Sequence, residues 1–363
     1  MDSKRHFRRA YGAFYADHRD SDALHQAIDF VCSPRVPVHG CMFALGLSPE
    51  QLIRFLQTGR RRDRGFAVSG SGFLRVEVPP SPGDTLSHPG PARGYLLFNS
   101  GTEVACLIGL PTDFQYLWSE LRRYAYSEIT GLYLRTLEFK KSLVTISRER
   151  PQTTVHVRGF TANVLWEDGQ TVKTRREWFP LAKPVPDFFL EFEQERQWLR
   201  SIELVVRRNG REGSGRIRRD LSFTCQRGFL VFWGTAVNAV IRTAAGHHGL
   251  LQNRSVFKSP TRAARPLQVS YPSGIFEDKR QNHRLIKVLR QLPDSGLSVF
   301  HCNPFLHGAL VDYSDGSTYT IWVTDNCAVK IIPGLKASPR SLGRLCNHIH
   351  EHFEEGAVEE ISV

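Results

Sequence analysis

The side chains most clearly suited to bind a ligand are the arginines of residues 205–276. This segment carries twelve basic and two acidic side chains, and no acidic residue occurs from Leu221 to Phe276. Clustered positive charge attracts polyanions, and nucleic acid releases condensed counterions when basic side chains bind it. We therefore expect the segment to grip the phosphate backbone of DNA or RNA. The residues expected to hold phosphates are Arg207, Arg208, Arg211, Arg216, Arg218 and Arg219, extended by Arg254, Lys258, Arg262 and Arg265.

The spacing of these residues predicts how they would act. Glycine and serine are interleaved with the basic residues from Arg207 to Arg219. This composition predicts a flexible loop, whose guanidinium groups fork onto phosphates while glycine lets the backbone approach closely. Phe257 lies between Arg254 and Lys258 in a polar stretch, so it is the candidate for stacking on a base.

The charge distribution leaves other interpretations open. The net charge of the whole chain is +12, whereas residues 65–204 are neutral and residues 277–363 are slightly acidic. A further basic run, formed by Arg60, Arg61 and Arg62, follows a short predicted helix, where cations also suit the helix dipole. Basic loops can also serve solubility alone or dock an acidic protein. A protein scaffold is therefore an alternative to nucleic-acid binding.

A second pattern would make the chain an enzyme. Two-metal nucleases of the Asp…Glu-x-Lys type bind magnesium with carboxylates and steady the attacking water with a lysine, and their Glu-x-Lys pair lies on a strand. Glu138 and Lys140 follow an alternating run, and Asp113 lies upstream of them. Asp113 also falls at a predicted helix start, where an acidic side chain favours the helix dipole. A metal-dependent nuclease is therefore an alternative, and binding without catalysis is the preferred interpretation.

The C-terminal sequence contains a possible metal-binding pair. His348 and His352 fit the pattern His-x-x-Glu-His, in which a helix presents two zinc-binding imidazoles one turn apart. Proteins with this pattern take a third ligand from a glutamate far downstream, whereas only 11 residues follow His352. We therefore expect a solvated helix face rather than a metal site. Because the glycine motifs of nucleotide-binding enzymes are also absent, we expect no cofactor.

The elements that position these residues alternate between helices and hairpins. Hairpin-then-helix units are expected near residues 94–128 and 308–354, each with a glycine-containing turn between two apolar runs. Periodic apolar residues predict helices at 21–31 and 187–204, and the apolar run Phe229–Trp233 predicts a strand. Because tight turns join most of the strands, we expect an α+β fold with largely antiparallel sheets and packed helices.

The length of 363 residues predicts two or three domains. The expected limits are 1–80 for an N-terminal region of helix and strand, 91–204 for an α+β domain, 205–276 for the basic segment with flexible loops, and 277–363 for a C-terminal α+β region.

Several features predict the cellular compartment. The seven cysteines are widely spaced and include no Cys-x-x-Cys pair, which indicates reduced thiols. The first 30 residues are charged throughout and lack the apolar core of a secretory signal. The longest apolar stretch, Phe229–Ile241, is shorter than the roughly 20 residues of a membrane span. We therefore predict a cytoplasmic protein without membrane contact, which binds nucleic acid as one subunit of a larger complex.

Overall fold

The computed structural model describes most of the chain. The described residues are 12–16, 18, 20–45, 48–58, 67–69, 73–79, 91–98, 104–125, 129–150, 152–165, 171–178, 182–193, 197–251, 264–271, 274–323, 325–335 and 337–361. The chain divides into two compact units: unit 1 comprises Met1–Ile129 and Tyr133–Ala245, and unit 2 comprises Thr130–Leu132 and Gly246–Val363. Helices and antiparallel sheets occur in both units, which confirms the α+β fold class.

This division differs from the limits expected from the sequence. Residues 205–245 belong to unit 1, whereas residues 246–276 belong to unit 2, so the basic segment 205–276 is not a region of its own. The difference arises because charge composition marks a segment of sequence, whereas contacts between strands and helices define a folded unit.

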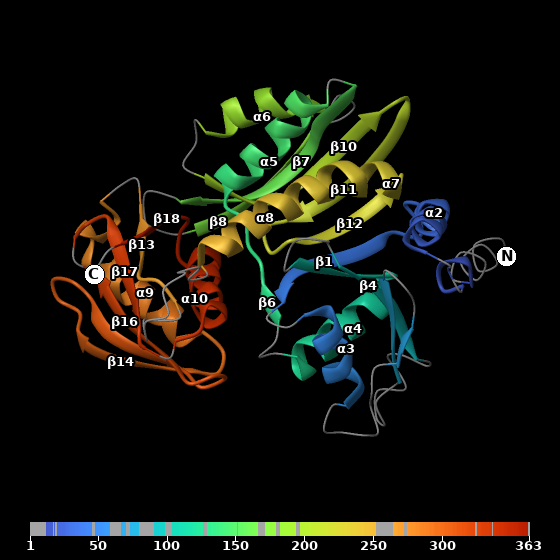
Figure 1. Ribbon diagram of the computed structural model, residues 1–363. Coiled ribbons are helices and arrows are strands. Elements are labelled where there is room, and N and C mark those ends of the chain that lie inside the picture. The colour runs from blue at the N-terminus through green and yellow to red at the C-terminus, as the bar shows by residue number, and fades with distance from the viewer. Residues whose placement is uncertain are drawn as a thin grey trace. The chain divides into compact units, whose positions relative to one another are not determined.

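Unit 1 contains a twelve-stranded sheet, except for Thr130 and Gly131 of its short strand β6, which are assigned to unit 2 (Figure 1). Its main path runs β2-β3-β4-β5-β1-β12-β11-β10-β7-β8, and the short strands β6 and β9 lie off that path. The strands are β1 (Val38–Leu45), β2 (Ala67–Ser69), β3 (Phe73–Val78), β4 (Ala92–Phe98), β5 (Val104–Gly109), β6 (Ile129–Gly131), β7 (Thr153–Leu165), β8 (Thr171–Glu177), β9 (Lys183–Pro184), β10 (Gln197–Arg208), β11 (Arg211–Arg218) and β12 (Ser222–Arg227). The antiparallel pair β1 and β12 joins the N-terminal strands to the rest of the sheet.

Helical segments connect or flank these strands. They are α2 (Ser21–Val31), α3 (Pro49–Thr58), α4 (Pro111–Tyr124), α5 (Thr136–Glu149), α6 (Val185–Phe192), α7 (Phe229–Phe232), a π-helical segment (Trp233–Val237) and α8 (Asn238–Leu251). The Asp20 carboxylate accepts the backbone N–H of Ala23 at 2.8 Å and caps α2. The predicted helix 21–31 and the predicted hairpin-then-helix unit at 94–128, formed by β4, β5 and α4, are both confirmed.

Two other predictions from the sequence are wrong. Residues 187–204 do not form one helix, because α6 ends at Phe192 and β10 begins at Gln197. Residues Phe229–Trp233 form helix instead of a strand. A short apolar run fits a buried strand and a buried helix equally well, so its periodicity did not distinguish them.

Glycine residues let α7 lie directly on the sheet. A Cβ atom at Gly213 would lie 2.6 Å from the Gly228 carbonyl oxygen, and one at Gly215 would lie 2.7 Å from the Phe232 ring. Gly228 has a φ of 58°, which is a left-handed conformation that glycine adopts without strain, and it turns the chain from β12 into α7. These glycines therefore serve the packing of a helix on a strand, and not the approach of a ligand.

The helical stretch Phe229–Gly246 is long and apolar enough to cross a membrane, by length and composition alone. In the structure, 56% of this stretch is buried inside the protein. Phe229, Phe232 and Val240 are fully buried, and α7 packs on β11 and α2. The stretch therefore packs as a helix of the protein core.

Unit 2 contains a six-stranded antiparallel sheet in the order β14-β15-β16-β17-β13-β18. Its elements are β13 (Leu267–Ser270), a 3-10 turn (Ile275–Glu277), α9 (Lys279–Arg290), β14 (Ser295–His301), β15 (His307–Asp312), β16 (Ser317–Val323), β17 (Ala328–Pro333), α10 (Pro339–His352) and β18 (Ala357–Glu360). The predicted hairpin-then-helix unit at 308–354 is confirmed by β15, β16 and α10. Buried side chains of α9 and α10 form one core with alternate residues of the sheet.

We expect Gly215→Ala to lower the free energy of unfolding by about 1 to 3 kcal/mol, because the added methyl group overpacks the contact with Phe232. Gly234→Ala is the matched control, since a Cβ atom at Gly234 would have no neighbour within 4 Å. Urea denaturation of both variants measures the difference. Equal stability of the two variants would show that the glycine contact does not limit the packing of α7.

Candidate nucleic-acid interface

The first part of the basic segment is a β-hairpin, not the flexible loop expected from its glycines. Strand β10 pairs with β11 up to Arg208, which lies opposite Arg211. Between them, Asn209 and Gly210 have φ angles of 50° and 74°. Positive φ at both central residues is the geometry of a type I′ turn, whose twist matches that of the two strands. The arginines are therefore held at fixed positions on this ribbon, which is part of the large sheet because β10 also pairs with β7 and β11 also pairs with β12.

Three arginines near the end of this ribbon lack an acidic partner among the described residues. Arg208 and Arg211 are exposed and flank the turn at the end of the sheet (Figure 1). Arg227 is the last residue of β12, is also exposed, and lies opposite Ser214 of β11. We call Arg208, Arg211 and Arg227 the hairpin arginines. Sequence analysis did not single out Arg227, because only the register of β12 brings it to this end of the sheet.

Three further arginines of the predicted set have partners within the fold. The Arg207 Nε atom donates to a Glu212 carboxylate oxygen at 2.9 Å. Arg216 is partly buried and forms an ion pair with Glu203, which lies opposite it on β10. Arg218 is exposed, and its guanidinium lies 3.3 Å from a serine hydroxyl. Glu203 precedes the basic segment in the sequence, so the composition of that segment did not reveal the pairing.

Arg219 has a structural position, in contrast to its predicted binding role. Its side chain is 5% exposed, and its guanidinium lies 4.2 Å from the centroid of the Tyr133 ring. Its backbone N–H donates to the carbonyl oxygen of Arg200, and its own carbonyl oxygen accepts the N–H of Leu134, both at 2.9 Å. A cation buried over an aromatic ring cannot reach a phosphate without unfolding its surroundings.

Several predicted residues lie outside the described part of the chain: Arg60, Arg61, Arg62, Arg254, Phe257, Lys258 and Arg262. Arg265 is described and lies in unit 2, where it forms an ion pair with Glu360 of β18. The predicted continuation of the phosphate track through Arg265 therefore falls in a different unit from the hairpin arginines.

The three predicted nuclease residues lie in separate contacts. Asp113 is buried in the first turn of α4 and accepts a hydrogen bond from the Tyr15 hydroxyl. Glu138 lies in the first turn of α5 instead of on a strand, and it accepts the backbone N–H of Arg135 at 2.7 Å. Lys140 binds a glutamate at the end of α6, also at 2.7 Å. Residues two positions apart on a helix do not share a face, so Glu138 and Lys140 point apart.

The two histidines of α10 lie side by side but differ in exposure. The ring centroids of His348 and His352 lie 4.5 Å apart, and His348 Nε2 lies 2.8 Å from the Val288 carbonyl oxygen. Burial lowers the pKa of His348, and nearby His352 lowers it further. His348 is partly buried, whereas His352 is exposed and lies on the expected solvated face. Among the described residues, no group of three or more His, Cys, Asp or Glu side chains is placed to hold a metal ion.

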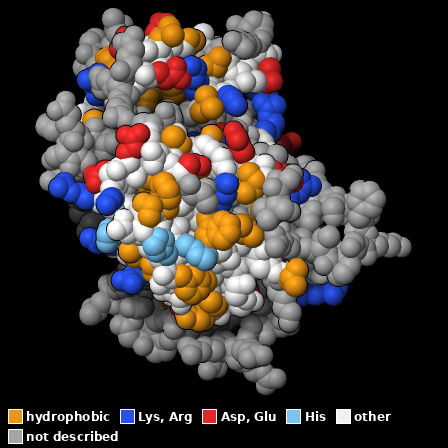
Figure 2. Space-filling view, turned by 90° about the vertical axis from the view of Figure 1, so that its left-hand side faces the viewer, with side chains coloured by type: hydrophobic (Ala, Val, Ile, Leu, Met, Phe, Trp, Pro, Cys, Tyr) orange, Lys and Arg blue, Asp and Glu red, His pale blue; other side chains and the backbone are white. Residues whose placement is uncertain are grey.

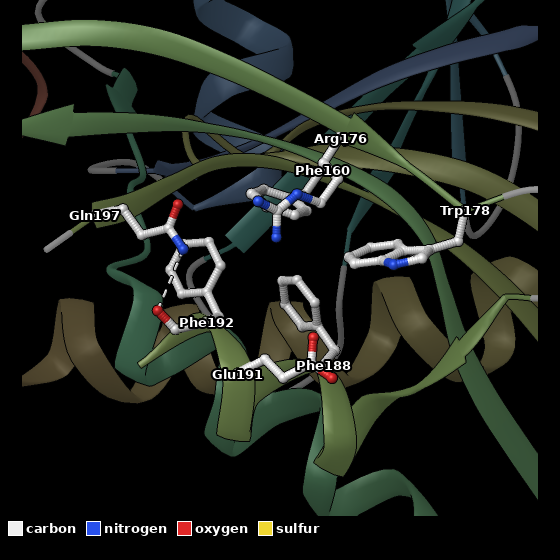
Figure 3. Close-up of a pocket in the computed structure, with 7 residues that line it drawn as sticks. All are labelled: Phe160, Arg176, Trp178, Phe188, Glu191, Phe192 and Gln197. Atoms are coloured by element: carbon white, nitrogen blue, oxygen red, sulfur yellow. Dashed lines mark hydrogen bonds between the residues drawn. The ribbon is translucent and has the colours of Figure 1, made fainter. Parts of the chain in front are cut away.

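A small aromatic pocket lies between β7, β8 and α6 (Figure 3). It encloses about 200 Å³ including open solvent, and it is lined by Phe160, Arg176, Trp178, Phe188, Glu191, Phe192 and Gln197. The three phenylalanine rings contact one another with centroids 5.3 Å apart. Lys183 lies 5.1 Å from the centroid of the Trp178 ring and forms an ion pair with Glu191. The pocket is smaller than ordinary ligand sites of about 300 to 1,000 Å³, and its aromatic rings belong to the core.

No protein-family model matches this chain, and no curated protein matches it significantly. The candidate interface therefore rests on the geometry of this chain alone.

Replacing Arg219 tests whether this residue is structural. We expect Arg219→Gln to lower the free energy of unfolding by about 2 kcal/mol, because it removes a buried contact between a cation and an aromatic ring. Arg218→Gln changes the exposed neighbour in the same way and should leave stability unchanged. Thermal unfolding of both variants compares them, and equal midpoints would exclude the structural role.

The partly buried His348 predicts a loss of stability in acid. Its folded-state pKa is lowered by burial, so its stabilising contribution is present above the unfolded pKa of about 6.5 and is lost as the pH falls below that value. We expect the free energy of unfolding to fall from neutral to mildly acidic pH, and to fall less in His348→Gln. Urea denaturation measures both, with His283→Gln as the exposed control. An equal pH dependence in both variants would contradict this assignment.

Proposed function

We propose that this chain binds the phosphate backbone of nucleic acid through the hairpin arginines, without catalysis of its own, as a cytoplasmic subunit of a larger complex. The observation that supports this proposal is the position of Arg208 directly opposite Arg211, both exposed and both without an acidic partner in the described part of the chain. The excess of basic residues in 205–276 supports the same partner.

A phosphate group would relieve an electrostatic cost in this hairpin. Like charges directly opposite each other on neighbouring strands destabilise a sheet, and Arg208 and Arg211 form such a pair. A guanidinium presents a rigid fork of donors that matches the oxygens of a phosphate. Binding would replace the repulsion between two cations by charge-assisted hydrogen bonds to one anion.

The shape of the hairpin favours contact with the backbone of the nucleic acid. The ladder of β10 and β11 and the two-residue turn hold the arginines in place, so binding does not have to order a loop. Phosphate contacts fix the position of a protein but carry no direct sequence information. We therefore expect binding with little sequence preference.

The alternative functions have less support. Asp113, Glu138 and Lys140 are held in separate contacts, so a nuclease would need other residues. If the partner were an acidic protein, its carboxylates would bind the same arginines. The purified chain would then bind no nucleic acid at low salt.

We expect the full chain to bind a labelled DNA duplex with an affinity that falls steeply with salt. Each neutralised phosphate contributes roughly 0.9 to the slope of log affinity against log salt, so Arg208→Ser with Arg211→Ser should reduce that slope by about 2. Fluorescence anisotropy at several salt concentrations measures the slope.

The matched control is Arg175→Ser with Arg242→Ser. It removes the same charge from two exposed arginines of unit 1 that already have acidic partners, Glu177 and Glu149. The control should keep most of the slope of the unmodified protein. An equal loss in both double variants would assign the effect to net charge, and an absence of binding at low salt would reject nucleic acid as the partner.

A further inference from the structure

The six-stranded sheet of unit 2 has one face buried and one face open. Leu310 and Ile321 point to the core that α9 and α10 share. The opposite face carries aromatic side chains that the described residues leave exposed: Phe300 is 64% exposed, Tyr313 is 69% exposed, and Trp322 is 38% exposed. Large aromatic side chains that gather on an exposed surface indicate a binding site.

The register of the strands brings side chains of this open face into one row. His301 on β14 lies opposite His307 on β15. His307 lies opposite Trp322 on β16, and Trp322 lies opposite Lys330 on β17. The His307 ring contacts Phe300 and Trp322 edge to face, with centroids 5.2 Å and 5.1 Å apart. We call Phe300, His301, His307, Trp322 and Lys330 the aromatic row.

Figure 2 shows the side of the molecule where Figure 1 labels β14, β16 and β17. Histidine side chains lie there next to hydrophobic side chains on the surface. The exposed fractions of Phe300 and Trp322 leave their rings accessible to a ligand.

Small side chains separate the aromatic row from a second exposed ring. The next positions along the strands are Ser298, Ala309 and Thr320. Beyond them, the Tyr313 hydroxyl lies over Gly296, at a place that a Cβ atom would occupy. The position opposite Gly296 is four residues from His307 on β15, which corresponds to roughly 14 Å. The open face thus carries aromatic rings at both ends, and the side chains between them include Val311 and Ile332 besides the small ones.

We propose that this open face binds single-stranded DNA or RNA by stacking unpaired bases on the aromatic row. An antiparallel sheet with exposed aromatic side chains provides such a stacking platform, since every base has a flat face that can lie on a ring. The inference rests on the proposed function in one respect, that the ligand of the chain is nucleic acid. It adds a second site, in the other unit, and it specifies unpaired bases.

The charge of the open face favours nucleic acid over an apolar protein partner. Lys330 extends the aromatic row, and the strands β14 to β17 place no acidic side chain on this face within their described residues. Past Lys330 the row continues through Gln268 of β13 to Glu359 of β18, so the cation lies nearer to the rings than the acidic side chain does. The hydroxyl groups of Ser298 and Thr320 lie beside the rings and can bond to sugars and base edges.

The test compares the affinity of the full chain for a labelled oligo(dT) with its affinity for a duplex of the same length. Stacking is worth about 1 to 3 kcal/mol per base, so Phe300→Ala with Trp322→Ala should weaken oligo(dT) binding by roughly tenfold or more. Duplex binding should stay unchanged, because paired bases are not available for stacking. Both replaced side chains are exposed, and circular dichroism checks that the variant is folded.

Phe30→Ala is the matched control, since Phe30 is an aromatic residue of α2 in unit 1 with 76% exposure. It should leave oligo(dT) binding unchanged. Photo-cross-linking with an oligonucleotide that carries 5-iodouracil gives a second measurement. Its cross-links should map to the strands β14 to β16.

The outcomes separate this inference from the proposed function. If Arg208→Ser with Arg211→Ser weakens duplex binding while Phe300→Ala with Trp322→Ala leaves oligo(dT) binding intact, the stacking site is rejected and the hairpin site stands. If neither nucleic acid binds, both proposals fail. If the aromatic variant changes only the oligomeric state, as seen by sedimentation, the open face is a contact between copies of the chain, and the stacking site is again rejected.

Discussion

The close contact between α7 and β11 is the constraint on which unit 1 depends. Gly213 and Gly215 leave no side chain between the strand and Phe232, so the helix lies directly on the sheet. Gly228 makes this possible by turning the chain back within one residue. Because the β10-β11-β12 meander is fixed by this contact, the hairpin arginines stand on a rigid support, and their separation is set by strand register rather than by loop flexibility.

Local signals predicted the hairpins near residues 94–128 and 308–354 and the helix 21–31, but not the turn at Asn209 and Gly210. The Asn209-Gly210 pair is a strong hairpin signal, although the glycines around it concealed the strand that follows. Glycine and arginine have low preference for strands, and tertiary packing overrode that preference in β11. The same packing decided that Phe229–Trp233 is helical, which no local pattern could establish.

The candidate site was predictable only in part. Arg208 and Arg211 were expected to hold phosphates, and their exposure is compatible with that role. Arg216 and Arg219 have partners, Glu203 and Tyr133, that lie outside the basic segment, so counting charges along the chain could not identify these contacts. The aromatic row was not predicted, because Phe300 and Trp322 are separated in sequence and only the register of β14, β15 and β16 brings them near His307.

The pairing of β1 with β12 has a consequence for the synthesis of the chain. Cys32, which follows α2, and Cys225 of β12 are 193 positions apart, yet their sulfur atoms lie 3.5 Å apart. During translation, β1 can pair with β5 long before β12 has left the ribosome. One edge of β1 then stays open, and open strand edges are sites of wrong pairing and aggregation. The large sheet is therefore completed only after β12 has been synthesised.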